Sequence, residues 1–177
     1  MTAMKEPRDG YAQALLELGA QHDDVFVLDG DCATPNYTIR FRNAYPERFV
    51  NIGIAECDII GTAAGLSLLG KVPFANAYAN FLTGRGYDQI RVSVAYCQRN
   101  VKIAGHNAGT TAAQEGATHL PLEDVGLMRA IPDMTVIVPA DATATLLIGT
   151  QEGGLEYFSR CYDTRVVTTD DVLAALA

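Results

Sequence analysis

Residues 48–75, RFVNIGIAECDIIGTAAGLSLLGKVPFA, contain the pattern that decides the fold. Two short apolar runs, at 49–52 and 72–75, have the length typical of buried strands. Between them, residues 56–69 repeat apolar side chains at helical spacing, and Gly70 follows as a typical helix C-cap. A strand, a helix and a second strand in this order predict a parallel βαβ unit.

The same alternation continues along the chain. Further strand-like runs occupy residues 25–28, 101–104, 134–138 and 155–158. Helical patterns cover residues 11–19, 87–98 and 142–150. Because most of the runs are continuously apolar, they suit strands that are buried on both faces. We therefore predict an α/β fold, a doubly wound and mostly parallel six-stranded sheet with helices on both faces and functional loops at the carboxyl ends of the strands.

The composition is that of an acidic, folded protein. The chain has 177 residues, of which 49% are hydrophobic and 19% charged, and its formal net charge is −8. Acidity disfavours nucleic acid as the main partner, because phosphates need basic clusters. No apolar run reaches the ~20 residues that span a bilayer, and the N-terminal residues lack the apolar core of a secretory signal. The four scattered cysteines lack zinc-site spacing, which favours reduced thiols and a cytoplasmic location.

Polar residues that could bind a ligand or take part in catalysis follow the predicted strands. Glu56 opens an apolar helix, where a first-turn acid often stabilises the helix dipole. A buried carboxylate also needs a partner or a functional reason, so both interpretations stay open. His106 and His119 flank a glycine-rich loop. Each alone could be a packed loop imidazole, whereas the pair favours contact with a ligand.

Other candidates have ordinary structural interpretations as well. Tyr78, Phe81 and Tyr87 suit an apolar core, and Arg8 and Arg160 suit a solvated surface. No Walker loop, dinucleotide fingerprint or nucleophile elbow is present. A Gly-Asp-Gly…Asn motif for Mg²⁺ and diphosphate is also absent.

Five stretches carry a family resemblance. They are residues 48–56 (RFVNIGIAE), 61–66 (GTAAGL), 81–91 (FLTGRGYDQIR), 116–123 (GATHLPLE) and 131–141 (IPDMTVIVPAD). In this order they resemble the pyrimidine-binding domain of transketolase-type thiamine diphosphate enzymes. The resemblance implies such a domain over residues 1–162, followed by a tail over residues 163–177 that could form a short helix.

The resemblance also implies contacts with the cofactor. The family glutamate that hydrogen-bonds a ring nitrogen of the aminopyrimidine matches Glu56. The aromatic residue that stacks on the pyrimidine matches Phe81, with Tyr78 or Tyr87 as neighbours. Asp31 falls near an acid that lies close to the thiazolium.

Substrate contacts are implied in the same way. Glu56, His106 and His119 are the implied catalytic residues. The arginines suit a sugar phosphate because a guanidinium pairs with phosphate oxygens. The implied substrate-binding residues are Arg8, His106, Glu115, His119 and Arg160.

The chain departs from the family in its extent. The diphosphate-binding domain and the usual C-terminal domain have no counterpart here, and Cys57 replaces the usual Gln after the glutamate. We therefore expect the pyrimidine-binding subunit of a split transketolase-like enzyme. A separate subunit would hold the diphosphate and Mg²⁺ in a 2:2 assembly, and a two-carbon ketol unit would pass from a ketose phosphate to an aldehyde.

Other functions fit the same residues. Deoxyxylulose-phosphate synthases and the β subunits of 2-oxoacid dehydrogenases share this type of domain. In these alternatives the cofactor would be the same and the donor substrate would differ. A non-catalytic interaction module would keep the interface and lose the chemistry. The retained glutamate, aromatic residue and histidines favour an enzyme over such a module.

Overall fold

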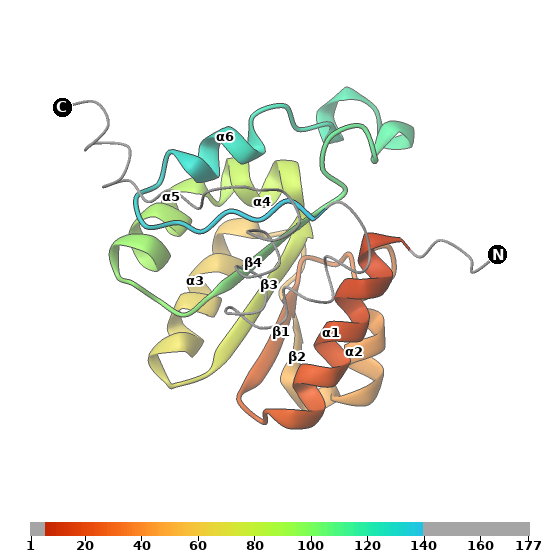
Figure 1. Ribbon diagram of the computed structural model, residues 1–177, viewed down its shortest axis with the longest axis vertical. Coiled ribbons are helices and arrows are strands. Elements are labelled where there is room, and N and C mark those ends of the chain that lie inside the picture. The colour runs from red at the N-terminus through yellow and green to blue at the C-terminus, as the bar shows by residue number, and fades with distance from the viewer. Residues whose placement is uncertain (1–5, 140–177) are drawn as a thin grey trace, which may run out of the picture.

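A parallel sheet forms the centre of the protein (Figure 1). The computed structural model describes residues 6–139, apart from the side chain of Ala113. The strands lie in the order β2-β1-β3-β4, and every neighbouring pair is parallel. They are β1 (Val25–Asp29), β2 (Phe49–Asn51), β3 (Val72–Tyr78) and β4 (Lys102–His106). The predicted α/β class, with a doubly wound parallel sheet, is confirmed.

Helices cover both faces of the sheet (Figure 1). One apolar cluster joins Val25 and Val27 of β1 to Leu15 and Phe41, which belong to α1 (Pro7–Gln21) and α2 (Ile39–Ala44). The other cluster joins Leu28 to the opposite group of helices. These are α3 (Glu56–Leu68), α4 (Ala79–Arg85), α5 (Tyr87–Gln89) and the π-helix η2 (Ile90–Tyr96). Successive residues of β1 thus face opposite cores, as the two-residue period of a strand requires.

Short elements complete the described chain. Three are single 3-10 turns: η1 (Pro46–Arg48), η3 (Ala113–Glu115) and η4 (Ala117–His119). The last helix, α6 (Asp124–Arg129), packs near α4. In the part of the chain that the structure describes, no helix is both long and apolar enough to cross a membrane.

The structure differs from the predicted elements in several places, and α2 and α6 were not predicted. β3 continues to Tyr78 and β4 to His106, although both ends were expected to be loops. The helix predicted over 87–98 is instead a short α-helix followed by a π-helix, and α4 precedes it. Residues 134–138, predicted as a strand, have no strand pairing, although Met134 and Val136 pack against the core. The strand predicted over 155–158, the helix over 142–150 and the tail lie outside the described residues.

The strand order creates a crevice at the carboxyl edge of the sheet. From β1 the chain passes to β2 on one side, and from β3 it passes to β4 on the other. The loops that leave β1 and β3 therefore diverge, which is the topological position where parallel α/β sheets bind ligands. Glycine 30, which follows β1, and Tyr78, which ends β3, lie at this position.

Candidate active site

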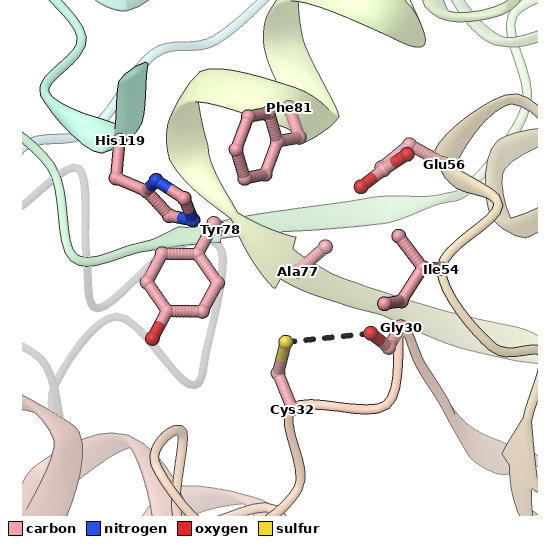
Figure 2. A pocket seen from close by; sticks show the side chains of 8 residues that line it. All are labelled: Gly30, Cys32, Ile54, Glu56, Ala77, Tyr78, Phe81 and His119. Carbon is pink, nitrogen blue, oxygen red and sulfur yellow. Dashed lines mark hydrogen bonds between the residues drawn. The ribbon is translucent and has the colours of Figure 1, made fainter. Parts of the chain in front are cut away.

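A pocket of about 130 Å³ opens at this crevice. Figure 2 shows three rings gathered on one side and a carboxylate on the other. Side chains from β3, α3, α4 and η4 meet there with the loops that follow β1 and β2. The lining residues are Gly30, Cys32, Ile54, Glu56, Ala77, Tyr78, Phe81 and His119.

Glu56 supplies the carboxylate. It is the first residue of α3, and its side chain is only 5% exposed. Gly53, at φ +87°, turns the chain between β2 and this helix. The Glu56 Oε2 atom accepts a hydrogen bond of 2.8 Å from Nη1 of Arg85. Glu56 is therefore both the helix-opening acid and a group that lines the pocket.

The aromatic wall consists of Tyr78, Phe81 and His119. Tyr78 ends β3, Phe81 lies one turn into α4 and His119 ends η4. The His119 ring meets Phe81 edge-on at 4.8 Å between centroids and Tyr78 edge-on at 5.6 Å. Stacked and edge-on rings of this kind form a rigid apolar surface, which suits a flat ring in a ligand.

Polar contacts hold the outer part of this wall. The Tyr78 hydroxyl donates a hydrogen bond of 3.2 Å to Oε1 of the exposed Glu115. Burial raises the pKa of the Tyr78 hydroxyl, and the negative charge of Glu115 raises it further. The side chain of Asn80 donates to the carbonyl of Thr118. Tyr78 is therefore a neutral donor that connects the pocket wall to Glu115.

Cys32 and Gly30 form the floor of the pocket. The Cys32 thiol lies 3.3 Å from the Gly30 carbonyl oxygen, and burial raises the pKa of this thiol to about 11. It is thus a neutral thiol at physiological pH. A side chain at Gly30 would place its Cβ 3.0 Å from Ile59 and 3.2 Å from Ala77. A side chain there would thus require Ile59 and Ala77 to shift by a few tenths of an ångström.

His106 lies outside the pocket lining, although the sequence pairs it with His119. Its Nε2 atom is 3.1 Å from Oδ1 of Asn76, and its ring meets Tyr11 edge-on at 5.1 Å. Burial, together with the nearby positive charge of Arg8, lowers the pKa of His106 to about 4. The structure therefore places a neutral imidazole between β4 and α1, and its role in substrate binding stays a prediction.

The other predicted site residues lie at different places. Tyr87 packs beside the apolar core under α3 and does not line the pocket. Asp31 is exposed and accepts a hydrogen bond of 3.0 Å from the Asn51 side chain. Arg8 donates to the Pro35 carbonyl at 3.1 Å, which places it near the carboxyl edge. Arg160 lies outside the described residues.

The structure adds residues that sequence reasoning did not select. Arg85 pairs with Glu56 and also lies over the Phe81 ring, 4.1 Å from its centroid. Cys32, Ile54 and Gly30 line the pocket. The sequence could have indicated Arg85, because residues four apart on a helix lie on the same face and Phe81 precedes Arg85 by four positions.

The described residues contain no cluster of three or more His, Cys, Asp or Glu side chains that could hold a metal ion. The carboxylate and the aromatic wall instead match a planar organic ligand that carries a hydrogen-bond donor. The geometry of this half-open site fits recognition of one end of such a ligand.

Comparisons with known proteins identify the family. Residues 4–147 match the model of the transketolase pyrimidine-binding domain. A Methanocaldococcus jannaschii protein named as a transketolase C-terminal section is 45% identical over 77% of this chain and 43% of its own length. The 6-deoxy-6-sulfo-D-fructose transketolase subunit SqwH of Clostridium sp. strain MSTE9 is 42% identical over 76% of this chain and 42% of its own length.

A solved structure agrees with this match. A split-gene transketolase described as an inactive beta4 tetramer superposes with a TM-score of 0.72 at 44% identity. The match covers 84% of this chain and 47% of that chain. The chain thus spans less than half the length of the relatives named here. With its glutamate, aromatic wall and strand order in place, the chain belongs to the transketolase pyrimidine-binding domain family.

Proposed function

We propose that this chain is the pyrimidine-binding subunit of a thiamine diphosphate-dependent, transketolase-like transferase. The enzyme would transfer a two-carbon ketol unit from a ketose phosphate to an aldehyde. The observation that carries the proposal is the buried Glu56 carboxylate facing the Phe81 ring across one pocket. A carboxylate can hydrogen-bond a ring nitrogen while the aromatic face packs on the same ring.

The residues present fit the pyrimidine end of this cofactor. Glu56 offers a buried acceptor at the pocket, and Phe81 with His119 offers an apolar wall. The Cys32 thiol stays neutral and puts no second charge beside the carboxylate. Thiamine diphosphate, when bound, supplies a nucleophilic carbon and an electron sink. Glu56 would hold the ring and share a proton with its nitrogen.

The same geometry supports a separate partner subunit. Ile54, a pocket-lining residue, is 74% exposed, so one wall of the site is open. We infer that a second chain closes this wall and supplies the diphosphate and Mg²⁺ sites in a 2:2 assembly. The names of the relatives describe subunits or sections of transketolases, which supports a division of the enzyme between two chains. The three described cysteines are unpaired thiols, in keeping with a cytoplasmic location.

Substrate binding would involve the outer part of the site. His119 belongs to the pocket wall, and Glu115 accepts a hydrogen bond from Tyr78 of the same wall; their polar groups suit the oxygens of a sugar. Arg8 near the carboxyl edge suits a phosphate. Arg160 and His106 remain predicted contacts.

Reconstitution tests this function. The chain is mixed with a candidate diphosphate-binding subunit, thiamine diphosphate and Mg²⁺, and ketol transfer from a ketose phosphate is measured. We expect Glu56→Gln to abolish turnover and leave assembly intact, because the amide keeps the shape but cannot share the proton. Turnover at the wild-type rate in this variant would contradict the proposal. An assembled complex that binds no thiamine diphosphate in calorimetry would favour the interaction module.

A further inference from the structure

Arg85 contacts both Glu56 and Phe81. Its Nη1 lies 2.8 Å from Glu56 Oε2, and its guanidinium carbon lies 4.1 Å from the centroid of the Phe81 ring. Arg85 ends α4, and the thiol of Cys57 donates to its backbone carbonyl at 3.2 Å. One cation therefore connects the acid and the ring that define the pocket.

The two oxygens of Glu56 have different surroundings. Oε2 is held by Arg85, whereas Oε1 has no hydrogen-bond partner among the described residues. Figure 2 shows the carboxylate at the pocket wall, beside Phe81 and Ile54. Arg85 itself does not line the pocket. The ion pair thus leaves one carboxylate oxygen available to a ligand.

Few other charges surround this carboxylate. The ionisable side chains that line the pocket with it are Cys32 from the loop after β1, Tyr78 from β3 and His119 from η4. Cys32 and Tyr78 are neutral, because burial raises the pKa of both groups. The ionisable residues on its own helix and on β1, α5 and η2, which pack against that helix, are Asp29, Cys57, Asp58, Tyr87, Asp88, Arg91 and Tyr96. Within the described chain, only Arg85 forms an ion pair with Glu56.

We propose that Arg85 is a positioning residue that gives the two oxygens of the Glu56 carboxylate different roles. Arg85 fixes Oε2 and stabilises the ionised form, so Oε1 accepts a hydrogen bond from the ligand ring nitrogen and the shared proton rests on that nitrogen. The guanidinium also holds the Phe81 ring in place for stacking. This inference deepens the proposed function and rests on it.

A purely structural ion pair would give different results. Arg85 is 51% exposed but Glu56 is only 5% exposed, so replacing Arg85 leaves a buried carboxylate without its cation and is expected to lower stability whether or not the pair has a role in the site. A purely structural pair would leave the acid limb of the kcat profile and the affinity for the cofactor unchanged in the folded protein.

The first test needs no cofactor. The Glu56 side-chain carboxyl carbon of the full chain is followed by NMR through a pH titration, with Glu56→Gln used to assign the signal. We expect Arg85→Gln and Arg85→Met to move protonation of this carboxyl to higher pH by about one unit, since an adjacent guanidinium typically has at least that effect. Arg85→Lys should titrate close to the wild type. An unchanged titration in both neutral variants would overturn the inference.

The second test uses the reconstituted complex. With Arg85→Gln, we expect the acid limb of the kcat profile to move up by about one pH unit and thiamine diphosphate affinity in calorimetry to fall on the order of tenfold. Arg85→Lys should restore the acid limb. Arg129→Gln, an exposed arginine at the end of α6, is the matched control and should leave both unchanged.

The outcomes separate the two proposals. A wild-type acid limb and wild-type affinity in Arg85→Gln would overturn the role of Arg85 while the proposed function stands. Turnover that survives Glu56→Gln would overturn the proposed function, and the cofactor-free titration would still decide whether Arg85 controls the ionisation of Glu56.

Discussion

Asn76 determines the state of His106 at the end of the sheet. Its side-chain amide donates to the carbonyls of Leu28 and Phe74, which fixes the orientation of Oδ1. This oxygen accepts a hydrogen bond of 2.6 Å from the Tyr11 hydroxyl and lies 3.1 Å from Nε2 of His106. Because Oδ1 can only accept, the hydrogen must lie on Nε2. The neutral imidazole therefore presents Nδ1 as its only ring acceptor.

His106 should make stability depend on pH. Its pKa is lowered to about 4 in the folded chain, so between about pH 4 and pH 6.5 the unfolded chain binds a proton that the folded chain does not. Stability is present in full above pH 6.5 and is lost as the pH falls towards 4, by about 3 kcal/mol. We expect His106→Gln to flatten this slope in urea unfolding at pH 4.5 and 7.

The matched control for this prediction is His22→Gln, because His22 is exposed. The His22 variant should keep the wild-type slope. A slope that persists unchanged in His106→Gln would show that other groups control the acid instability.

At the scale of elements, one glycine precedes α3 and another lies inside it, and the two have different backbone conformations. Gly53 precedes the helix at φ +87°, and no neighbour lies within 4 Å of a Cβ built on it. Gly61 lies inside the helix, also with open space around a Cβ. A substitution at either position therefore tests backbone conformation alone, without a steric clash.

We expect opposite effects from alanine at these two positions. Gly53→Ala should lower the free energy of unfolding by about 1–2 kcal/mol, the cost of a left-handed residue with a side chain. Gly61→Ala should raise it by about 0.5–1 kcal/mol, because alanine favours the helix interior. Denaturant unfolding of the chain measures both, and equal effects at the two sites would contradict this assignment.

The elements also show what the sequence could and could not predict. Of the six strands predicted from apolar runs, four are present, because buried parallel strands are continuously hydrophobic; residues 134–138 form no strand and residues 155–158 lie outside the described chain. Of the predicted site residues, Glu56, Tyr78, Phe81 and His119 line one pocket. The continuation of β3 was missed because residues 76–78 include polar and aromatic side chains that are typical of loops. Pairing of Tyr78 with His106 makes them strand residues. Only tertiary pairing supplies that information.

Side-chain direction is the part of the site that sequence spacing could not supply. His106 shares the face of Asn76 and turns towards Tyr11 of α1, while Ala77, next to Asn76, lines the pocket. Tyr87 packs against the apolar core and does not line the pocket, so its contact with a ligand stays a prediction. Sequence spacing places a residue at a strand end, but the pleat of the strand and the neighbouring helix decide on which face of the sheet its side chain lies.

At the scale of the molecule, an apolar surface over α3 and η2 is exposed within residues 6–139. Leu68 and Leu69 at the end of α3 are 65% and 76% exposed, and Tyr96 of η2 is more exposed still. A groove of about 340 Å³ lies between these two elements, lined by Gly61, Ala64, Gly65, Leu68, Ser93, Cys97 and Arg99. An exposed apolar patch of this kind is typical of a protein interface. In the proposed assembly, another subunit covers it.

Leu69→Glu should therefore impair assembly and leave folding intact. Because the side chain is already in water, the free energy of unfolding of the isolated chain should stay within about 0.5 kcal/mol of the wild type. The dissociation constant of the reconstituted complex should rise about tenfold or more in sedimentation velocity, since a charge would be buried. Val125→Glu, on α6, is the control. Equal assembly of the Leu69 and Val125 variants would exclude this face as the interface.

The strand order also affects how the protein is made. The central strand, β1, pairs on one side with β2 and on the other with β3, and both of these follow it in the chain. During synthesis, Val27 and Leu28 thus leave the ribosome well before their second neighbour exists. Translation that stalls before Tyr78 would leave this strand open along one edge, a state prone to aggregation. The ribosome must therefore complete β3 before the nascent chain can close its own sheet.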